Sequence, residues 1–494
     1  MVGFRKYSVK FIRYFFILFF LLILIAAIRN MLTESPAAAL LCLPALAMLL
    51  FLLFRGRSMC SRRLARIHIA VHLFSFFLTL FIAYSCRVEL SWDWGHVVRN
   101  AISLALNGEL ENYSYFLQYP NNQFWLALLT LCFRAVKLVC AGVSERMLRA
   151  AAMGISIILV RAGGAFLYKS MEDLFGVQRA RIADIIFSLY LPVHLYAFFA
   201  YTDTSGYFCV CCMIYLYCRL RRLEKPAPGL SILFAVMAAL VFKIKILAFL
   251  IFSAMLIADL LAAQLPLSAL LKRYGCICAL MAVGILIFNL GGKAVIQLDE
   301  SNADRFRFPA VHWLMMGMND YGGYRQKDVD FSYEYQTYEE RKAADSQELI
   351  RRLHARGFGG TLRFMADTKL RRTWGNSLLA GDDYISRWPI NASSLGEKVF
   401  SKDGQFHRLC LSYSWVYHIM LLLGCFLSGL LGKQDNKLLF AWISLLGVTL
   451  FLSFWECNSR YLFTFIPVLI LCSADGWLAV RELRPLRFRF SQED

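Results

Sequence analysis

The chain has 494 residues, of which 59% are hydrophobic, 15% aromatic and only 18% charged. This composition argues against a purely soluble fold, because several apolar runs reach the roughly 20 residues that a helix needs to cross a bilayer. The formal net charge of +19 could indicate a nucleic-acid binder. However, the basic residues gather in short clusters between apolar runs, as the positive-inside rule describes for cytoplasmic loops. We therefore expect an all-α polytopic membrane protein that does not bind nucleic acid.

The 15 cysteines are scattered, and many lie inside apolar runs, where cysteine acts as a small buried hydrophobe. Neither a CxxC pair nor a His/Cys metal-binding spacing is visible, so a disulfide framework and a zinc framework are both disfavoured. The first apolar run follows a basic N-terminus and lacks a small-residue cleavage site. We therefore expect this run to be an uncleaved helix rather than a signal peptide.

About thirteen apolar segments have the length expected of membrane helices. In chain order they cover residues 11–28, 38–54, 69–85, 122–140, 150–168, 183–199, 207–220, 230–242, 246–261, 271–290, 409–431, 438–454 and 462–477. Basic clusters such as 55–66 and 219–225 mark the cytoplasmic side. The segment 122–140 contains Arg134 and Lys137. We place it in the outer interface, or as a re-entrant hairpin, because every later basic loop then stays inside.

The charge rule divides the chain into four parts, with both termini cytoplasmic. Residues 1–66 form two additional N-terminal helices and a basic loop, and residues 67–290 form the membrane core with a first outer loop at 86–122. Residues 291–408 are polar, and we expect them to form an extracytoplasmic domain of α/β or mixed structure. Residues 409–494 supply the last membrane helices and a basic cytoplasmic tail.

The first outer loop holds a single carboxylate, Asp93, between Trp92 and Trp94. A carboxylate just beyond an outward-going helix could act as a general base toward an acceptor hydroxyl. The tryptophans could stack on a sugar or anchor the loop in the membrane interface. The alternative is a solvated acid beside an aromatic belt, and His96 remains an unassigned candidate for contact with a substrate.

Further charged residues fall near other predicted helix ends. Asp203 is expected on the same side as Asp93, although capping of the next helix would also explain it. Lys243 and Lys245 interrupt an apolar hairpin, where a charge costs about 2.5 to 3.5 kcal/mol on insertion scales. Two residues apart, they point about 200° apart around a helix, so both can face one pocket only if the helix breaks there. Phosphate binding and snorkelling to the surface both stay open.

Glu456 and Arg460 precede the last apolar segment and could form an ion pair or bind phosphate or sugar. In the polar region, the motifs HWLMMGMNDYGGY, which holds His312, and KLRRTWGN, which begins at Lys369, combine aromatic, amide and charged groups as sugar-binding surfaces do. Their glycines could equally mark turns. The chain contains no P-loop, no GxGxxG motif and no GxSxG elbow, so a nucleotide-driven pump and a soluble-type hydrolase lack support.

The order of these features resembles the GT-C superfamily of polytopic glycosyltransferases, which use polyprenyl- or dolichyl-phosphate-linked sugars at the extracytoplasmic or luminal face. The matching elements are an early outer acid, a Tyr-Pro segment, a second acid, a lysine-bearing hairpin and a late acid-x-x-x-Arg-Tyr element with proline in the last helix. They comprise Asp93, Tyr119, Pro120, Asn121, Asn122, Asp203, Lys243, Lys245, Glu456, Arg460, Tyr461 and Pro467. Within the superfamily the chain looks closest to the protein-mannosyltransferase and aminoarabinose-transferase-like group, and more narrowly to bacterial cell-envelope members.

The resemblance implies inverting transfer of a sugar from a polyprenyl-phosphate donor to an extracytoplasmic glycan, polymer or lipid, in the plasma membrane of a bacterium. By resemblance Asp93 is the general base, Asp203 the second catalytic acid, and Lys243, Lys245 and Arg460 the groups that stabilise the leaving phosphate. The implied substrate-binding residues are Trp92, Trp94, His96, Tyr119, Asn121, Asn122, His312, Lys369 and Glu456. No cofactor is expected. A divalent metal lacks support because Asp203 lies in Asp-Thr-Ser rather than in DxD or DxE, and because Asp93 has no adjacent acid.

Two other functions stay open. A transporter or flippase for a lipid-linked glycan would need ionisable residues along a path through several spans, whereas here they gather near the outer ends. An O-antigen polymerase or ligase also has a large outer loop and should rely on loop arginines and a histidine. His312 and Arg325 keep that alternative open.

Overall fold

The computed structural model describes residues 2–55, 59–140, 142–223, 227–262, 266–390, 395–432 and 436–482. Within these ranges every regular element is helical, and the only β pairing is one isolated bridge between Val88 and Pro389. The predicted all-α polytopic fold class is therefore confirmed. Parts of the predicted basic loops, at 56–58 and 224–226, and the predicted basic tail from 483 onward lie outside the described residues.

In the described part of the chain, eight helical stretches are long and apolar enough to cross a membrane, and three shorter apolar helices accompany them, against about thirteen segments expected. The eight correspond to α1 (Val2–Glu34), α2 (Pro36–Arg55), α3 (Ser61–Ser85), α6 (Gln123–Val139) with the 3-10 turn η1 (Pro120–Asn122), α7 (Glu145–Phe175), α13 (Leu267–Ile296), α21 (His407–Leu431), and α23 (Ile466–Glu482) with the 3-10 helix η4 (Ser459–Phe465). The three are α11 (Pro228–Ile244), α12 (Phe249–Ala262) with η2 (Ile246–Ala248), and α22 (Leu439–Phe454).

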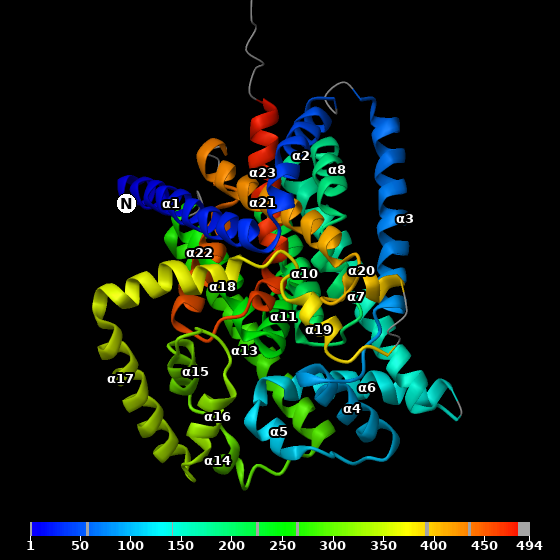
Figure 1. Cartoon of the computed structure of the whole chain (residues 1–494), viewed down its shortest axis with the longest axis vertical. Coiled ribbons are helices and arrows are strands. Elements are labelled where there is room, and N and C mark those ends of the chain that lie inside the picture. The colour runs from blue at the N-terminus through cyan, green and yellow to red at the C-terminus, as the bar shows by residue number, and fades with distance from the viewer. Residues whose placement is uncertain are drawn as a thin grey trace, which may run out of the picture.

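The remaining helices are shorter or more polar than these apolar ones. They are α4 (Trp92–Leu106), α5 (Tyr113–Gln118), α8 (Val177–Phe187), α9 (Leu191–Tyr196) and α10 (Thr202–Arg222). The polar region adds α14 (Ala303–Phe306), α15 (Ala310–Gly317), α16 (Gln326–Tyr333), α17 (Tyr338–Phe364), the π-helical turn η3 (Met365–Lys369), α18 (Leu370–Trp374), α19 (Gly381–Ser386) and α20 (Leu395–Phe400). In Figure 1, α3 stands upright at one edge, α4 to α6 and α14 to α16 gather at the lower end, and α2 and α8 lie toward the upper end.

Burial separates central helices from peripheral ones. In the apolar stretch that ends in α23, 83% of the residues are buried, whereas in α13 only 6% are. The exposed positions of α13 include Leu286, Ile287 and Leu290. A helix that is apolar on its outward face is suited to lipid rather than to water. The protein therefore has an inner layer around α10, α21 and α23, and an outer layer in which α3 and α13 present apolar side chains outward.

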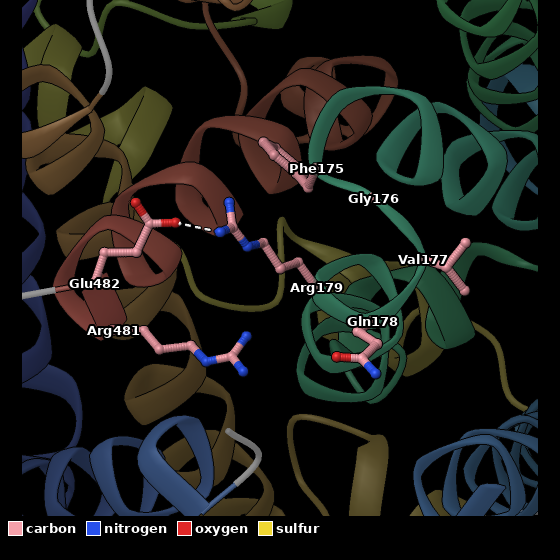
Figure 2. Close-up of a pocket in the computed structure, with 7 residues that line it drawn as sticks. All are labelled: Phe175, Gly176, Val177, Gln178, Arg179, Arg481 and Glu482. Atoms are coloured by element: carbon pink, nitrogen blue, oxygen red, sulfur yellow. Dashed lines mark ion pairs between the residues drawn. The ribbon is translucent and has the colours of Figure 1, made fainter. Parts of the chain in front are cut away.

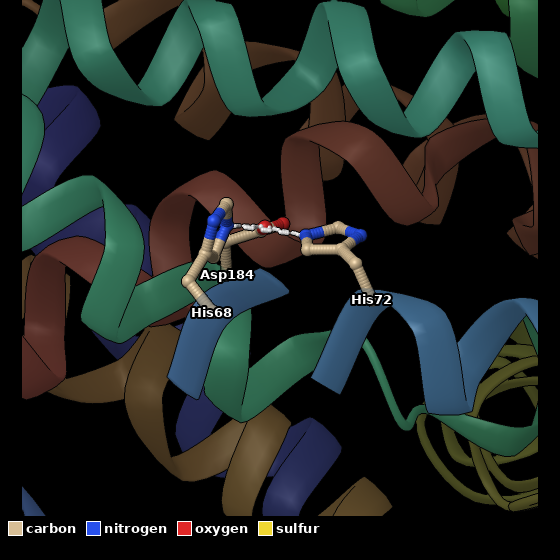
Figure 3. Close-up of side chains that lie close together, drawn as sticks. All are labelled: His68, His72 and Asp184. Carbon is tan, nitrogen blue, oxygen red and sulfur yellow. Dashed lines mark hydrogen bonds and ion pairs between the residues drawn. The ribbon is translucent and has the colours of Figure 1, made fainter. Parts of the chain in front are cut away.

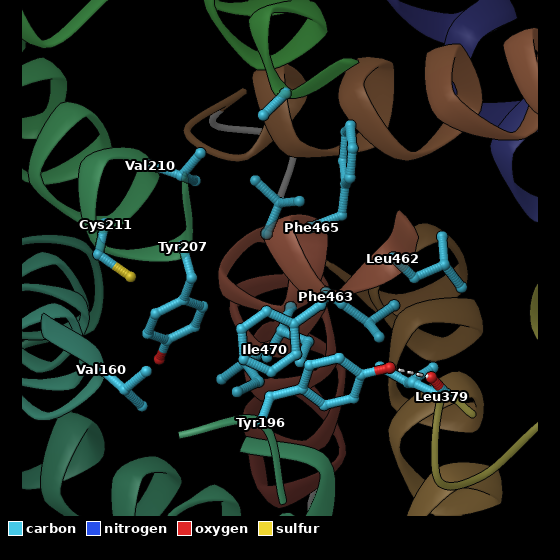
Figure 4. Packing of buried hydrophobic residues seen from close by; sticks show 14 of the residues in the cluster. Val160, Tyr196, Tyr207, Val210, Cys211, Leu379, Leu462, Phe463, Phe465 and Ile470 are labelled. Atoms are coloured by element: carbon cyan, nitrogen blue, oxygen red, sulfur yellow. Dashed lines mark hydrogen bonds between the residues drawn. The ribbon is translucent and has the colours of Figure 1, made fainter. Parts of the chain in front are cut away.

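The aromatic packing shown in Figure 4 fixes η4 against the inner helices. The Phe463 ring lies 4.6 Å from the ring of Tyr196 on α9 and 5.5 Å from the ring of Tyr207 on α10, measured between centroids. The Tyr196 hydroxyl donates a hydrogen bond of 2.5 Å to the Leu379 carbonyl. Since large buried rings contribute most to core packing, this contact holds the start of the last helix firmly against α9 and α10.

The single helix predicted over residues 183–199 is wrong. The chain ends α8 at Phe187, turns, and starts α9 at Leu191 with Pro192 in its first turn. Proline in the first turn needs no N–H partner, but it could not continue α8. The carbonyl of Ser188, freed by the break, accepts hydrogen bonds from Ser75 Oγ at 3.0 Å and from His194 Nε2 at 3.0 Å. These side chains stabilise the break in a way that apolar periodicity does not reveal.

The polar region also differs from its prediction. Its described residues form α14 to α20 and no strand, so the α/β or mixed structure expected for 291–408 is replaced by helices there. The longest of them, α17, begins with a capping box in which Thr337 and Glu340 bond each other's backbone N–H groups. This arrangement satisfies two N–H groups at the helix start that would otherwise lack partners.

Candidate functional site

Four charged side chains from distant parts of the sequence converge at one place. Lys245 Nζ donates a 2.7 Å hydrogen bond to Asp203 Oδ1. Arg460 lies between the two acids, with Nε 3.8 Å from Asp203 Oδ2 and Nη2 3.7 Å from Asp93 Oδ2. The result is a series of alternating charge, Asp93–Arg460–Asp203–Lys245, which we call the charge cluster.

Both acids of the charge cluster sit in the first turn of a helix, Asp93 in α4 and Asp203 in α10. A helix N-terminus favours negative charge because its backbone N–H groups lack intrahelical partners. At α4 the entry is tight: a Cβ added to Gly95 would lie 2.6 Å from the carbonyl carbon of Leu90, so only glycine permits this turn. Trp92 has φ +41°, a conformation that a bulky side chain rarely adopts.

The two lysines of the apolar hairpin point to different places, as their spacing around a helix predicts. Helix α11 ends at Ile244, and Lys245 has an extended φ of −147° before η2 begins, so its side chain turns toward Asp203. Lys243 stays in α11 and donates to Asn289 Oδ1 on α13 at 2.5 Å. It lines a pocket between α6, α11 and α13 whose apolar walls include Phe124 and Phe288. The helix break therefore brings one lysine to the charge cluster and leaves the other outside it.

Aromatic rings enclose the Arg460 guanidinium. Its central carbon lies 4.9 Å from the Trp92 ring centroid, 5.4 Å from Tyr384, 5.6 Å from Tyr201 and 5.7 Å from Tyr461. Such rings attract a cation through their electron-rich faces. Arg460 Nε has no hydrogen-bond partner among the described residues. The guanidinium is thus held by rings and by acids at 3.7 to 3.8 Å, while one of its N–H groups makes no hydrogen bond.

A polar network positions Asp93. The Tyr115 hydroxyl donates to Asp93 Oδ1 at 3.0 Å and accepts from Asn122 Nδ2 at 2.7 Å. Asn122 Oδ1 in turn accepts from the Tyr201 hydroxyl at 3.1 Å and from Asn121 Nδ2 at 3.2 Å. Burial, and next the charge of Asp93, raise the pKa of Tyr115 well above its usual value, so this phenol stays protonated and keeps donating.

Exposure distinguishes the two acids. The side chain of Asp93 is 35% exposed, whereas that of Asp203 is 2% exposed. Only Asp93 can therefore be approached by a molecule from outside the protein. Asp203 is enclosed between Lys245 and Arg460, where it compensates their buried positive charge.

Several predicted substrate-binding residues surround Asp93. The His96 ring stacks on Tyr115 at a centroid distance of 4.4 Å, and the Tyr119 ring lies 5.0 Å from Tyr115. Burial, followed by the Arg99 charge, lowers the pKa of His96, which keeps it neutral near pH 7. Trp94 is buried beside Trp92, with ring centroids 6.3 Å apart.

Glu456 reaches the charge cluster only through Tyr461. Its Oε2 accepts from the Tyr461 hydroxyl at 2.5 Å and its Oε1 from the Tyr324 backbone N–H at 3.1 Å. Lys369 is buried, and its ammonium donates to three backbone carbonyls, those of Gly317 at 3.0 Å, Gly322 at 2.9 Å and Trp455 at 2.5 Å. With three donors on an ammonium, Lys369 has none left for a substrate, and it joins the polar region to the segment after α22.

His312 is not brought to the charge cluster either. Its side chain is fully buried, stacks on Phe308 at 4.0 Å and makes a 2.7 Å hydrogen bond to Ser332 Oγ. Ser332 also donates to Asp345 Oδ1 at 2.6 Å. These contacts connect α15, α16 and α17 inside the polar region.

Three aromatic residues of the site were missed by the sequence reasoning: Tyr115, Tyr201 and Tyr384. Tyr115 and Tyr201 lie within a few residues of predicted site residues, and their place beside an acid was the available signal. Tyr384 comes from α19, and its ring lies 4.4 Å from that of Trp92. No local signal marks it, because only the folded chain brings α19 to α4.

A second hollow lies far from the charge cluster, where the turn between α7 and α8 meets the end of α23 (Figure 2). It is lined by residues 175–179 together with Arg481 and Glu482. Arg179 Nη2 forms a 2.7 Å ion pair with Glu482 Oε1 across it. Its described lining offers this ion pair, Arg481 and an amide, and its acid, Glu482, is already paired with Arg179.

A family model described as "Conserved hypothetical integral membrane protein" matches residues 4–478. The chain belongs to this family. Membership makes it an integral membrane protein, in agreement with the apolar helices that the structure describes.

The other comparisons give little information about the reaction at this site. No curated protein matches the sequence. Among solved structures, the chain is similar to the crystal structure of ArnT from Cupriavidus metallidurans bound to undecaprenyl phosphate, with 11% sequence identity and a TM-score of 0.35 over 84% of this chain and 78% of that one. The chemistry of the site therefore has to be inferred from its own residues.

Proposed function

We propose that the chain is a membrane glycosyltransferase that moves a sugar from a polyprenyl-phosphate carrier to a hydroxyl of a glycan, polymer or lipid acceptor. The observation that supports this most strongly is the partly exposed Asp93 carboxylate at the end of an otherwise buried charge cluster. Such a transfer needs a base for the acceptor and positive charge for the departing phosphate, and the cluster offers both.

In this mechanism Asp93 accepts the proton of the acceptor hydroxyl while the hydroxyl oxygen attacks the anomeric carbon. The bond between that carbon and the phosphate oxygen breaks, and polyprenyl phosphate leaves with the bonding electrons. Attack from the side opposite to the leaving group inverts the anomeric centre. The guanidinium of Arg460, whose Nη2 lies 3.7 Å from Asp93 Oδ2, supplies a donor for the phosphate within reach of Asp93.

The remaining cluster residues have supporting roles in this proposal. Asp203 is a positioning residue, because it is buried and already contacts Lys245 and Arg460. Lys245 adds positive charge near the leaving group. Lys243, beside the apolar-walled pocket of Phe124 and Phe288, is suited to the phosphate end of a lipid carrier before it reaches the cluster.

We further propose that the site faces the extracytoplasmic side of a bacterial plasma membrane, as the distribution of basic loops predicts. Full burial of His312 argues against the O-antigen polymerase or ligase alternative, since that reading relies on an accessible histidine. The acids of the charge cluster lie at the starts of α4 and α10 rather than along a path through several spans, which argues against a transport path.

The test uses membranes that contain the full chain and a panel of polyprenyl phosphates carrying radiolabelled hexoses or pentoses. Wild-type membranes should move label from at least one of these donors into a delipidated or lipid acceptor fraction. Asp93→Asn should lower that rate by about 10²- to 10⁴-fold, the usual contribution of a general base.

Glu109→Gln is the matched control, because Glu109 is an exposed acid of the same outer loop. It should transfer sugar at the wild-type rate. Equal rates for wild type and Asp93→Asn, at matched expression, would remove Asp93 as the base.

A further inference from the structure

Two histidines and an aspartate meet at a place that the proposed reaction does not use. Figure 3 shows His68 and His72, on α3, directed toward Asp184 on α8. His68 Nε2 lies 2.6 Å from Asp184 Oδ2, His72 Nε2 contacts the same oxygen, and the two Nε2 atoms are 3.1 Å apart. The three potential ligand atoms all lie within 4.8 Å of one another.

The sequence explains why the two histidines lie together. Residues four apart in a helix lie on the same face, so His68 and His72 project together from α3. The position of Asp184 depends on packing, because α8 lies against α3 and places Asp184 opposite the two rings. The four-residue spacing of the histidines is a signal for such a site, although it contains no cysteine.

The separation of the two imidazole nitrogens is close to that of two ligands on one metal ion. A zinc ion binds imidazole nitrogen and carboxylate oxygen at about 2.0 to 2.2 Å, which puts neighbouring tetrahedral ligands about 3.3 Å apart. Two Nε2 atoms 3.1 Å apart, both facing one carboxylate oxygen, are close to that spacing. Small rotations of the three side chains would open room for an ion between them.

The surroundings leave one coordination position open. The side chains of His68 and Asp184 are 13% and 11% exposed, but that of His72 is 32% exposed. The Tyr168 ring covers His68 on the inner side at a centroid distance of 4.7 Å. The nearby cation, Arg161, is engaged by Ser75 Oγ at 2.8 Å and by the His72 carbonyl at 3.4 Å, and so bonds none of the three ligand atoms.

We propose that His68, His72 and Asp184 bind a divalent transition-metal ion of the zinc class, with water as the fourth ligand. Imidazole and carboxylate ligands suit Zn²⁺, Co²⁺, Ni²⁺ and Cu²⁺ and disfavour the purely oxygen-bound Mg²⁺ and Ca²⁺. The histidines of this site lie 13 and 17 residues before the end of α3, or about 20 and 26 Å along the helix from the loop that leads to Asp93. It is therefore separate from the charge cluster, and it does not rest on the proposed activity.

The consequence of such a site is structural. Helix α3 presents much of its surface outward, with only 22% of its apolar stretch buried. An ion held by two residues of α3 and one of α8 would tie this outer helix to its neighbour. Since α3 leads directly into the loop before α4, its position sets the entry to the charge cluster.

The test is metal binding by the purified full chain in detergent, stripped with a chelator and titrated with Co²⁺. The wild type should bind one equivalent and develop the ligand-field absorption of four-coordinate cobalt, which Zn²⁺ then abolishes. His68→Ala, His72→Ala and Asp184→Asn should each weaken binding by at least about tenfold. His354→Ala, which removes an exposed histidine on α17, should bind as the wild type does.

Failure of the wild type to take up Co²⁺ or Zn²⁺ would overturn the proposal, and this measurement requires no variant to fold. Unchanged affinity in all three ligand variants would also overturn it, because the ion would then sit elsewhere. Neither result bears on sugar transfer by Asp93, so the two proposals fail independently.

Discussion

At the scale of single residues, the charge cluster depends on how Lys245 and Arg460 keep their charge inside the protein. The carboxylate of Asp203, 2% exposed, has one direct hydrogen bond in the cluster, from Lys245, and a longer contact from Arg460. A buried ion pair stabilises little by itself, but removal of one partner leaves a buried charge uncompensated. Lys245 should therefore matter to stability even without substrate.

Lys245→Met tests this directly. We expect it to lower the free energy of unfolding by about 3 kcal/mol, toward the lower end for a broken buried pair because Arg460 remains near Asp203. The measurement is thermal unfolding in detergent. Lys243→Met is the control, since its partner is the neutral Asn289, and it should shift the unfolding midpoint much less. Equal shifts would show that loss of the Lys245–Asp203 bond costs the protein no more stability than loss of the Lys243–Asn289 bond.

Most residues of the charge cluster could be predicted from the sequence, but their contacts with one another and their burial could not. Asp93, Asp203 and Arg460 stand out because charge is rare in an apolar chain, and the charge rule puts the acids on one side. That Arg460 lies between them, and that Asp203 is buried while Asp93 is exposed, depends on the packing of η4 against α9 and α10. Lys369 and His312 were chosen on composition alone, and the fold uses them inside the polar region.

At the scale of elements, two helix breaks build the site. The break at Lys245 turns that side chain to Asp203, and the break between α8 and α9 leads the chain to Tyr201 and the start of α10. Pro192 gave a hint of the second break. The first has no proline or glycine at Lys245, but the two lysines that interrupt the apolar run already predicted separate helices over 230–242 and 246–261. The break lets Lys245 Nζ donate to Asp203 on α10.

Gly206 on α10 makes room for this bend. A Cβ at this position would lie 3.0 Å from Thr464 Cγ2 and 3.2 Å from Lys245 Cβ. We expect Gly206→Ala to push η4 and Lys245 away from α10 and to destabilise the protein by about 1 to 3 kcal/mol, as overpacking usually does. Thermal unfolding measures the effect.

Gly164→Ala is the matched control for that experiment. Gly164 lies inside α7, and an added Cβ would meet no atom within 4 Å. Alanine favours a helix interior by up to about 1 kcal/mol over glycine. Gly164→Ala should therefore raise the unfolding midpoint or leave it unchanged. If both variants behaved alike, close packing at Gly206 would not be limiting.

At the scale of the whole molecule, α3 relates the two ends of the protein. Its 25 residues rise about 37 Å, more than the roughly 30 Å of bilayer hydrocarbon. If α3 crosses the membrane, its first residue, Ser61, and the loop that follows Ser85 and leads to Asp93 lie on opposite faces. Helices of the polar region, α14 to α16, gather with α4 to α6 at the Asp93 end in Figure 1. The order of basic loops predicts that this end is extracytoplasmic.

This sidedness predicts the labelling of two thiols by a membrane-impermeant maleimide. Glu109→Cys places a thiol in the exposed loop after α4, and it should react in intact cells. The native Cys60 is exposed just before α3 and should react only after the membrane is opened. Cys60→Ser provides the background from the other exposed cysteines, Cys132 and Cys276, which lie within apolar helices and should react slowly. Labelling of Cys60 in intact cells, with Glu109→Cys protected, would reverse the orientation and move the proposed sugar transfer to the cytoplasmic face.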